Sequence, residues 1–178
     1  MRGFSMAELM VVVAIVALVT GLALPSFSGL IERWRVLQAV KGLESTLYFA
    51  RAEAIKRGGN ITVRKHPTGT SGCLLAPGNA NWDCGWFVFI DNNGNGNLNA
   101  GEEVLQSFPA PPNIDVTRVG GSANIQFDRS GRVVGPFVGF SLVPHDKNIS
   151  DLAARGLCMS SGGRIRTLKP EDMPCTSG

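Results

Sequence analysis

The sequence predicts an α+β protein in which a long N-terminal helix packs against an antiparallel β-sheet. Three observations lead to this fold class. An uncharged stretch of 23 residues separates Glu8 from Glu32, a helical periodicity follows it to about residue 57, and short apolar runs bounded by Gly, Pro, Asn or Asp fill residues 59–178. A chain of 178 residues accommodates one compact domain of about 100–150 residues and one further element.

The uncharged stretch comes first and predicts a membrane-embedded or bundled helix over residues 4–28. At about 1.5 Å per residue, 23 residues are long enough to cross a hydrocarbon layer about 30 Å thick. A secretory signal with Arg2 as its basic end is the alternative. Such signals have a shorter apolar core, of about 7–15 residues, and no reason to retain a carboxylate within it, so Glu8 argues against one.

Glu8 needs a partner, because an ionised carboxylate at the edge of an apolar helix costs several kcal/mol when it is left uncompensated. Cleavage after Gly3 would create a cation on the new terminal residue, Phe4. The Glu8 carboxylate of one subunit could then neutralise the Phe4 amine of the next when the apolar helices bundle. Such a pair would set the register of the bundle as well as its charge.

The following segment, residues 29–58, predicts an amphipathic half-helix with one apolar face. Charged residues fall largely between its apolar positions, and Gly58-Gly59-Asn60 supplies a stop signal. Pro25 predicts a kink between the two halves. The apolar positions recur every three or four residues: Leu30, Trp34, Leu37, Val40, Leu43, Leu47, Ala50 and Ala54.

The remainder, residues 59–178, is expected to supply an antiparallel sheet that covers the apolar face. The runs are rich in β-branched and aromatic residues, and Asp128-Arg129-Ser130-Gly131 is a turn signal between two of them. The expected strands are 60–64, 86–90, 103–108, 114–117, 124–127, 137–142 and 164–168.

The four cysteines form two sequence-local pairs, Cys73 with Cys84 and Cys158 with Cys175. An even count in loop-rich surroundings behind an export-type segment favours disulfides in an oxidising compartment. Four cysteines allow three pairings, of which the local one is favoured. Neither pair has C-x-x-C spacing and the two histidines are isolated, so a zinc site is not expected.

The charge distribution excludes a general electrostatic field on the β-rich part. Residues 1–57 carry seven basic and four acidic side chains, and residues 58–178 carry ten of each. Any nucleic-acid binding must therefore come from a local patch. The chain has no P-loop, no G-x-S-x-G and no H-E-x-x-H motif, so no enzymatic activity is expected.

The segment Gly3-Phe4-Ser5-Met6-Ala7-Glu8-Leu9-Met10, followed by the apolar run and Pro25, resembles the signal of type IV pilins and pseudopilins. The resemblance implies a leader of residues 1–3, prepilin cleavage after Gly3 by a membrane peptidase, and N-methylation of Phe4. It also implies a single-pass inner-membrane protein with a periplasmic C-terminal domain. Its expected partners are other major and minor pilins, the prepilin peptidase and the inner-membrane assembly platform.

The β-rich part is similar to minor pilins and pseudopilins of the GspH/FimT type. The resemblance rests on the Cys73–Cys84 loop leading into Gly85-Trp86-Phe87-Val88, on the Asn/Gly-rich loop ending at Glu103-Val104-Leu105, and on Phe127-Asp128-Arg129-Ser130-Gly131-Arg132. It implies an accessory subunit that primes or joins a pilus. A minor pseudopilin of a type II secretion system is the alternative.

Residues 91–102 match the spacing of a calcium loop, with oxygen ligands expected at Asp91, Asn93, Asn95 and Glu102. Two anionic ligands predict weak affinity, and strands rather than helices flank the loop. We therefore favour a polar hairpin connection and expect no resident metal.

Gly163-Arg164-Ile165-Arg166 is a second candidate site. Side chains alternate along a strand, so Arg164 and Arg166 should share a face, about 7 Å apart, at a spacing that suits successive phosphates. Resemblance to pilins of the FimT kind implies non-specific binding of double-stranded DNA by these two arginines during natural transformation, with Arg155 and Lys169 adding to the patch. The alternative is a solvated basic face, paired with the acidic segment 83–115.

Overall fold

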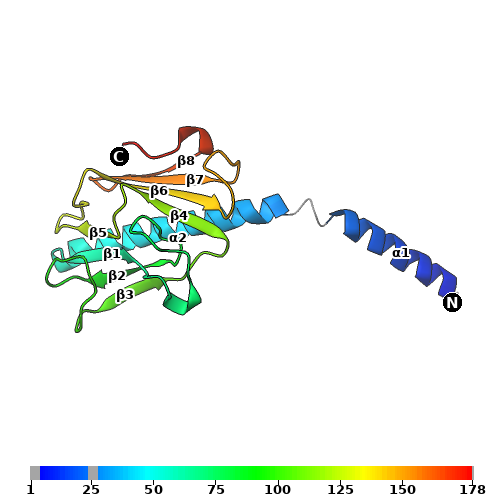
Figure 1. The fold of residues 1–178 in the computed structure, drawn as a ribbon, viewed down its shortest axis with the longest axis horizontal. Coiled ribbons are helices and arrows are strands. Elements are labelled where there is room, and N and C mark those ends of the chain that lie inside the picture. Colours follow the sequence, from blue (N-terminus) through cyan, green and yellow to red (C-terminus); the bar gives the residue numbers. More distant parts are fainter. Residues whose placement is uncertain (1–4, 24–27, 178) are drawn as a thin grey trace. The chain divides into compact units, whose positions relative to one another are not determined.

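The computed structural model describes residues 5–23 and 28–177. The chain divides into two compact units, Met1–Glu32 and Arg33–Gly178, and we call the second unit the head. Helix α1 (Met6–Ala23) lies in the first unit, and helix α2 (Ser28–Arg57) begins there and continues into the head (Figure 1). The kink predicted near Pro25 lies outside the described residues.

Helix α2 confirms the predicted amphipathic half-helix, with a shift in where its buried face begins. Leu30, Trp34 and Leu37 are exposed, so the apolar face starts one to two turns later than predicted. Gly58 adopts a φ of 80°, and the Gly59 N–H donates to the Ala54 carbonyl at 2.8 Å, which ends the helix in a Schellman motif. The buried residues of α2 are Val36, Ala39, Val40, Leu43, Thr46, Leu47, Ala50 and Ala54.

The head contains two four-stranded antiparallel sheets, where a single sheet was expected. The strand order is β3-β2-β1-β5 in one sheet and β4-β6-β7-β8 in the other. The strands are β1 (Ile61–Lys65), β2 (Trp86–Ile90), β3 (Val104–Phe108), β4 (Ile114–Val119), β5 (Asn124–Phe127), β6 (Phe137–Pro144), β7 (Arg155–Ser160) and β8 (Ile165–Leu168).

Both sheets and α2 contribute to one hydrophobic core. Val63 of β1, Phe140 of β6 and Leu157 of β7 belong to the same buried cluster as Leu43 and Leu47 of α2. The Trp86 indole N–H donates to the Thr46 hydroxyl at 3.0 Å, which satisfies two buried polar groups at the contact between β2 and α2. The prediction of a helix covered by antiparallel β-structure is thus confirmed.

Strand β7 is absent from the predicted set. Its sequence Arg-Gly-Leu-Cys-Met-Ser has no β-branched residue and no alternation of apolar with polar positions. The reason is that β7 lies inside its sheet and is buried on both faces. Leu157 and Met159 belong to the core, whereas Cys158 is bonded to Cys175 of the C-terminal segment.

Both predicted disulfides are present, Cys73–Cys84 and Cys158–Cys175. The first closes the segment between β1 and β2, and the second attaches the C-terminal segment to β7. Closing loops of 11 and 17 residues lowers the conformational entropy of the unfolded chain.

The two histidines are expected to titrate on opposite sides of the ordinary histidine pKa of about 6.5. The hydrogen bond from His145 Nδ1 to the Asp115 carboxylate, at 2.8 Å, raises the pKa of His145, whereas burial lowers the pKa of His66. The His145 contribution to stability is therefore present below its unfolded pKa and lost as pH rises through its folded pKa. The His66 contribution is lost as pH falls from its unfolded towards its folded pKa.

NMR titration of the imidazole protons can follow both residues separately, because the chain has only two histidines. The substitution Asp115→Asn should return the His145 pKa towards its ordinary value and leave His66 unchanged. An unchanged His145 pKa in that variant would show that Asp115 is not the cause.

Candidate functional site

The first candidate site is the start of α1, where Ser5 and Glu8 cap the helix. The Glu8 N–H donates to the Ser5 hydroxyl at 3.2 Å, and the Ser5 N–H donates to the Glu8 carboxylate at 3.4 Å. This reciprocal pair is a capping box, which satisfies two N–H groups that have no partner within the helix. This role of Glu8 was not predicted, although the spacing Ser-x-x-Glu before an apolar run is its signal. Gly3 and Phe4, the predicted cleavage site, lie outside the described residues.

Helix α1 carries a single charged side chain, Glu8, and its described side chains up to Thr20 are exposed. In the part of the chain that the structure describes, no helix combines the length and apolar character required to cross a membrane.

The second candidate site is the turn between β7 and β8, which contains the Gly163-Arg164-Ile165-Arg166 segment. The Gly163 N–H donates to the Ser160 carbonyl at 2.9 Å, and the Ser160 N–H donates to the Arg164 carbonyl at 2.9 Å. Gly163 has a φ of 91°, in the left-handed region that favours glycine. The turn thus presents Arg164 at the start of the edge strand β8.

Gly163 is also required by Arg51, which reaches this turn from α2. The Arg51 guanidinium donates to the Gly163 carbonyl at 3.1 Å. A Cβ atom on Gly163 would lie 2.2 Å from a guanidinium nitrogen of Arg51. This contact has no local signal in the sequence, because 112 residues separate the two partners.

The substitution Gly163→Ala is expected to lower the free energy of unfolding by about 2 kcal/mol, since it strains a positive φ and displaces the Arg51 guanidinium. Gly162→Ala is a matched control, because a Cβ there meets no atom closer than 3.9 Å and should change stability by less than about 0.5 kcal/mol. Urea unfolding of both variants measures the difference. Equal midpoints for the two variants would contradict the prediction.

The four residues predicted to bind DNA differ in their surroundings. Arg164 is exposed, and its side chain has no hydrogen bond or ion pair with any residue in the described ranges. Arg166 donates to the Ser177 carbonyl at 2.9 Å, and Arg155 donates to the carbonyls of Leu152 and Ala154. Lys169 lies 3.9 Å from the Glu171 carboxylate. Arg166 pairs in register with Cys158 of β7, so it lies on the sheet face that carries the disulfide.

The calcium-like loop, residues 91–102, joins the antiparallel strands β2 and β3, as the hairpin interpretation expected. The buried Asp91 carboxylate accepts hydrogen bonds from the Thr62 hydroxyl at 2.9 Å, the Gly96 N–H at 2.8 Å and the Asn95 N–H at 3.1 Å. The Glu102 carboxylate accepts from the N–H groups of Asn92 and Asn99.

The other two predicted ligands make local contacts within this loop. The Asn93 and Asn95 side-chain oxygens accept from the N–H groups of Asn95 and Asn97. Among the described residues, no group of three or more His, Cys, Asp or Glu side chains could hold a metal ion. Both carboxylates of the loop accept hydrogen bonds from its backbone N–H groups.

An apolar helix that precedes a head of antiparallel strands, folded around an amphipathic helix, defines a pilin-like protein. Residues 39–163 match the family model described as Type II transport protein GspH, which is more than half of the chain. The chain belongs to this family. Pilins and pseudopilins are structural proteins that assemble with other pilins.

The comparisons with individual proteins agree with this assignment. The chain is 32% identical over 102 residues to the pilin-like protein PilA1 of Thermus thermophilus, which is 57% of this chain and 56% of that protein. The chain therefore spans about half the length of this relative.

Its fold is similar to that of the type IV minor pilin FimU of Pseudomonas aeruginosa in two crystal forms. The TM-scores are 0.59 and 0.56, with sequence identities of 20% and 19%. The matches cover 82% and 79% of this chain, and 96% and 98% of the FimU chains. At these identities the similarity establishes the shared fold.

Proposed function

We propose that the protein is a minor type IV pilin that primes pilus assembly or joins the pilus. This proposal rests on the order of two elements along the chain. A capped apolar helix with one carboxylate at its start is followed by a GspH-family head. The likeness to a minor pilin fold supports it.

In this mechanism a prepilin peptidase cuts after Gly3 and exposes the Phe4 amine. Residues 4–28 hold the subunit in the inner membrane, with the head in the periplasm. During assembly the Glu8 carboxylate meets the Phe4 amine of a neighbouring subunit. The apolar helices then leave lipid for the centre of the fibre, where they bury their exposed side chains against one another.

Deletion of the gene in the producing organism tests the proposal, with surface pili, natural transformation and protein secretion scored separately. A minor pilin predicts fewer pili and normal secretion, restored by the wild-type gene. Loss of secretion with normal pili would instead establish the alternative, a minor pseudopilin of a type II secretion system. Edman sequencing of the mature protein should return Phe4 as the first residue.

A second candidate function, binding of double-stranded DNA, is favoured by one observation. The Arg164 guanidinium is exposed and unpaired with respect to the described residues, and Arg166 follows two positions later. Guanidinium groups bind phosphate oxygens without reading base sequence, so binding should be non-specific and weakened by salt.

A gel-shift series with the full chain in non-ionic detergent tests this function. Wild type should shift duplex DNA at low salt, and the double variant Arg164→Ala/Arg166→Ala should shift it more weakly. Absence of a shift for wild type would exclude DNA binding and leave the role in pilus assembly intact.

A further inference from the structure

Three segments that are distant in sequence meet at one end of the head (Figure 1). They are the last turns of α2, the turn after β5 at residues 128–132 and the turn after β7 at residues 160–164. The Val133 N–H donates to the Ser161 carbonyl at 3.1 Å, which joins the two turns. Gly131 and Gly163 both lie against the Arg51 side chain, which joins the turns to α2.

This end of the head presents three exposed arginines, Arg129, Arg132 and Arg164. Their guanidinium groups make no hydrogen bond or ion pair with any residue in the ranges 5–23 and 28–177. Arg129 and Arg132 belong to the first turn and Arg164 to the second. We call these three residues the arginine surface.

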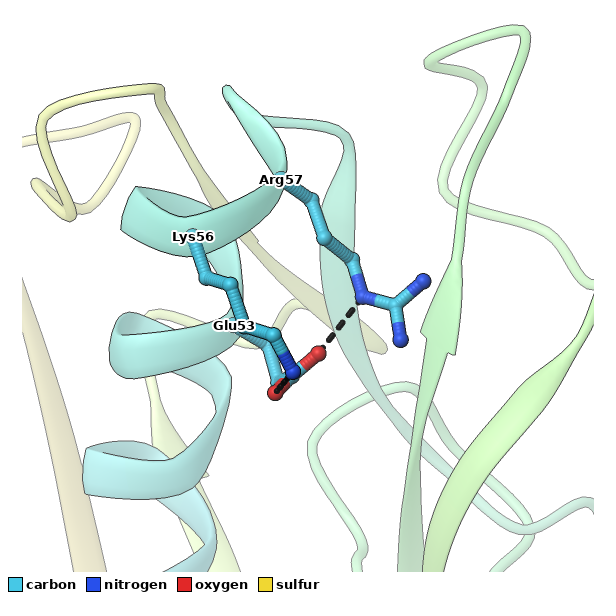
Figure 2. A network of polar contacts seen from close by, with 3 residues as sticks. All are labelled: Glu53, Lys56 and Arg57. Carbon is cyan, nitrogen blue, oxygen red and sulfur yellow. Dashed lines mark hydrogen bonds and ion pairs between the residues drawn. The ribbon is translucent and has the colours of Figure 1, made fainter.

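The other basic residues nearby are already paired. Glu53 holds both bases of the last α2 turn, with its carboxylate 2.5 Å from Arg57 Nε and 3.2 Å from Lys56 Nζ (Figure 2). The Asp128 carboxylate lies in the same turn as Arg129 and Arg132. It accepts hydrogen bonds from the N–H groups of Ser130 and Arg132, and these bonds hold the pKa of Asp128 below its ordinary value. Arg129 and Arg132 interact electrostatically with Asp128 without forming an ion pair, so the three guanidiniums outnumber the described carboxylate that lies among them.

Arg51 positions the two turns relative to each other. Its guanidinium donates to the Gly163 carbonyl, and a Cβ atom on Gly131 would lie 2.8 Å from its Cγ atom. Both glycines have positive φ, of 70° and 91°, which favours glycine at these positions. A side chain on either glycine would collide with Arg51, so the backbone of each turn can lie close to this arginine. Arg51 is therefore a positioning residue, whereas the three members of the arginine surface remain free to bind.

We infer that the arginine surface, and not the outer face of β8, is where the phosphates of bound DNA are held. This inference rests on the proposed DNA binding and revises its site. Three of the four residues predicted from sequence, Arg155, Arg166 and Lys169, already contact other groups of the chain. Arg164 belongs both to the residues predicted from sequence and to the arginine surface. Arg129 and Arg132 take the place of Arg155, Arg166 and Lys169 in the inferred site. Planar guanidinium groups on two turns suit the phosphates of one duplex backbone.

Fluorescence anisotropy of a labelled 30-base-pair duplex, with the full chain in non-ionic detergent, tests the site. Arg132→Gln should weaken binding by about threefold or more and lower the slope of log K against log salt by about one. Arg166→Gln should have a smaller effect. Arg33→Gln is the matched control, because Arg33 is an exposed arginine 18 residues before Arg51 on the same helix, about 27 Å away along its axis.

The outcomes separate the site from the function. Binding that is lost with Arg166→Gln and kept with Arg132→Gln would overturn the arginine surface but keep DNA binding. Absence of binding by wild type would overturn both. Displacement of the duplex by poly-L-glutamate as readily as by unlabelled duplex would assign the surface to an acidic protein partner instead, and so overturn the inference. Equal melting temperatures of Arg132→Gln and wild type would show that the loss of DNA affinity in this variant is not caused by unfolding.

Discussion

Replacing Asp91 with alanine is expected to lower the free energy of unfolding of the head by about 3–4 kcal/mol. The Asp91 side chain is buried and accepts hydrogen bonds from the Thr62 hydroxyl and from the N–H groups of Asn95 and Gly96. Removal of the carboxylate leaves these donors without their acceptor, and each unsatisfied buried donor costs about 1–3 kcal/mol. For a domain of this size the melting temperature should fall by about 10 °C.

The measurement is thermal unfolding in EDTA, with Asn93→Ala as the control. The Asn93 side chain is exposed, and its oxygen accepts the Asn95 N–H, so its loss should cost less than about 1 kcal/mol. Asp91→Asn should fall between the two, because one oxygen acceptor remains while the amide nitrogen meets other donors.

The same experiment decides between the two interpretations of this loop. If Asp91 organises the backbone, calcium added to wild type leaves the melting temperature unchanged. The opposite result would be an unchanged melting temperature for Asp91→Ala in EDTA, together with a calcium-dependent gain that wild type shows and the variant lacks. That result would make Asp91 a metal ligand.

The parts of the fold that the sequence predicts are those with a local signal. The period of Leu43, Leu47, Ala50 and Ala54 indicates the helix face, and Gly58 indicates its end. Strand β7 was missed because its burial on both faces depends on Cys175, which follows 17 residues later. A pattern within six residues cannot contain that information.

The candidate sites show the same division. Arg164 was predicted because it lies in a short motif, whereas Arg132 lies near it because the Val133 N–H donates to the Ser161 carbonyl and Arg51 contacts both turns. The role of Arg51 depends on two glycines, Gly131 and Gly163, in separate turns. A surface built from three segments that are distant in sequence cannot be recognised from a local pattern within any one of them. The capping role of Glu8 is different, because Ser5 and Glu8 are three residues apart and the Ser-x-x-Glu spacing predicts a capping box.

The second large effect is expected at Glu8, where two roles of one carboxylate can be separated. Glu8→Gln keeps the capping box, since glutamine also occupies this position in capping boxes, but removes the charge. Ser5→Ala keeps the charge and removes the hydroxyl that accepts the Glu8 N–H, at a cost of about 1 kcal/mol to the helix. Glu8→Ala removes the charge and the carboxylate that accepts the Ser5 N–H, but keeps the backbone N–H that donates to the Ser5 hydroxyl.

Assembly through the Phe4 amine of a neighbour makes a specific prediction for these three variants. Glu8→Gln and Glu8→Ala should both abolish incorporation into the fibre, because an ammonium buried among apolar helices without a counter-charge costs about 3–5 kcal/mol or more. Ser5→Ala should assemble at near wild-type levels. The measurement is the amount of each variant in sheared pili relative to the amount in membranes, from strains that express them equally. Normal incorporation of Glu8→Gln together with loss of Ser5→Ala would show that Glu8 acts through the helix cap, and the pairing with Phe4 would then be wrong.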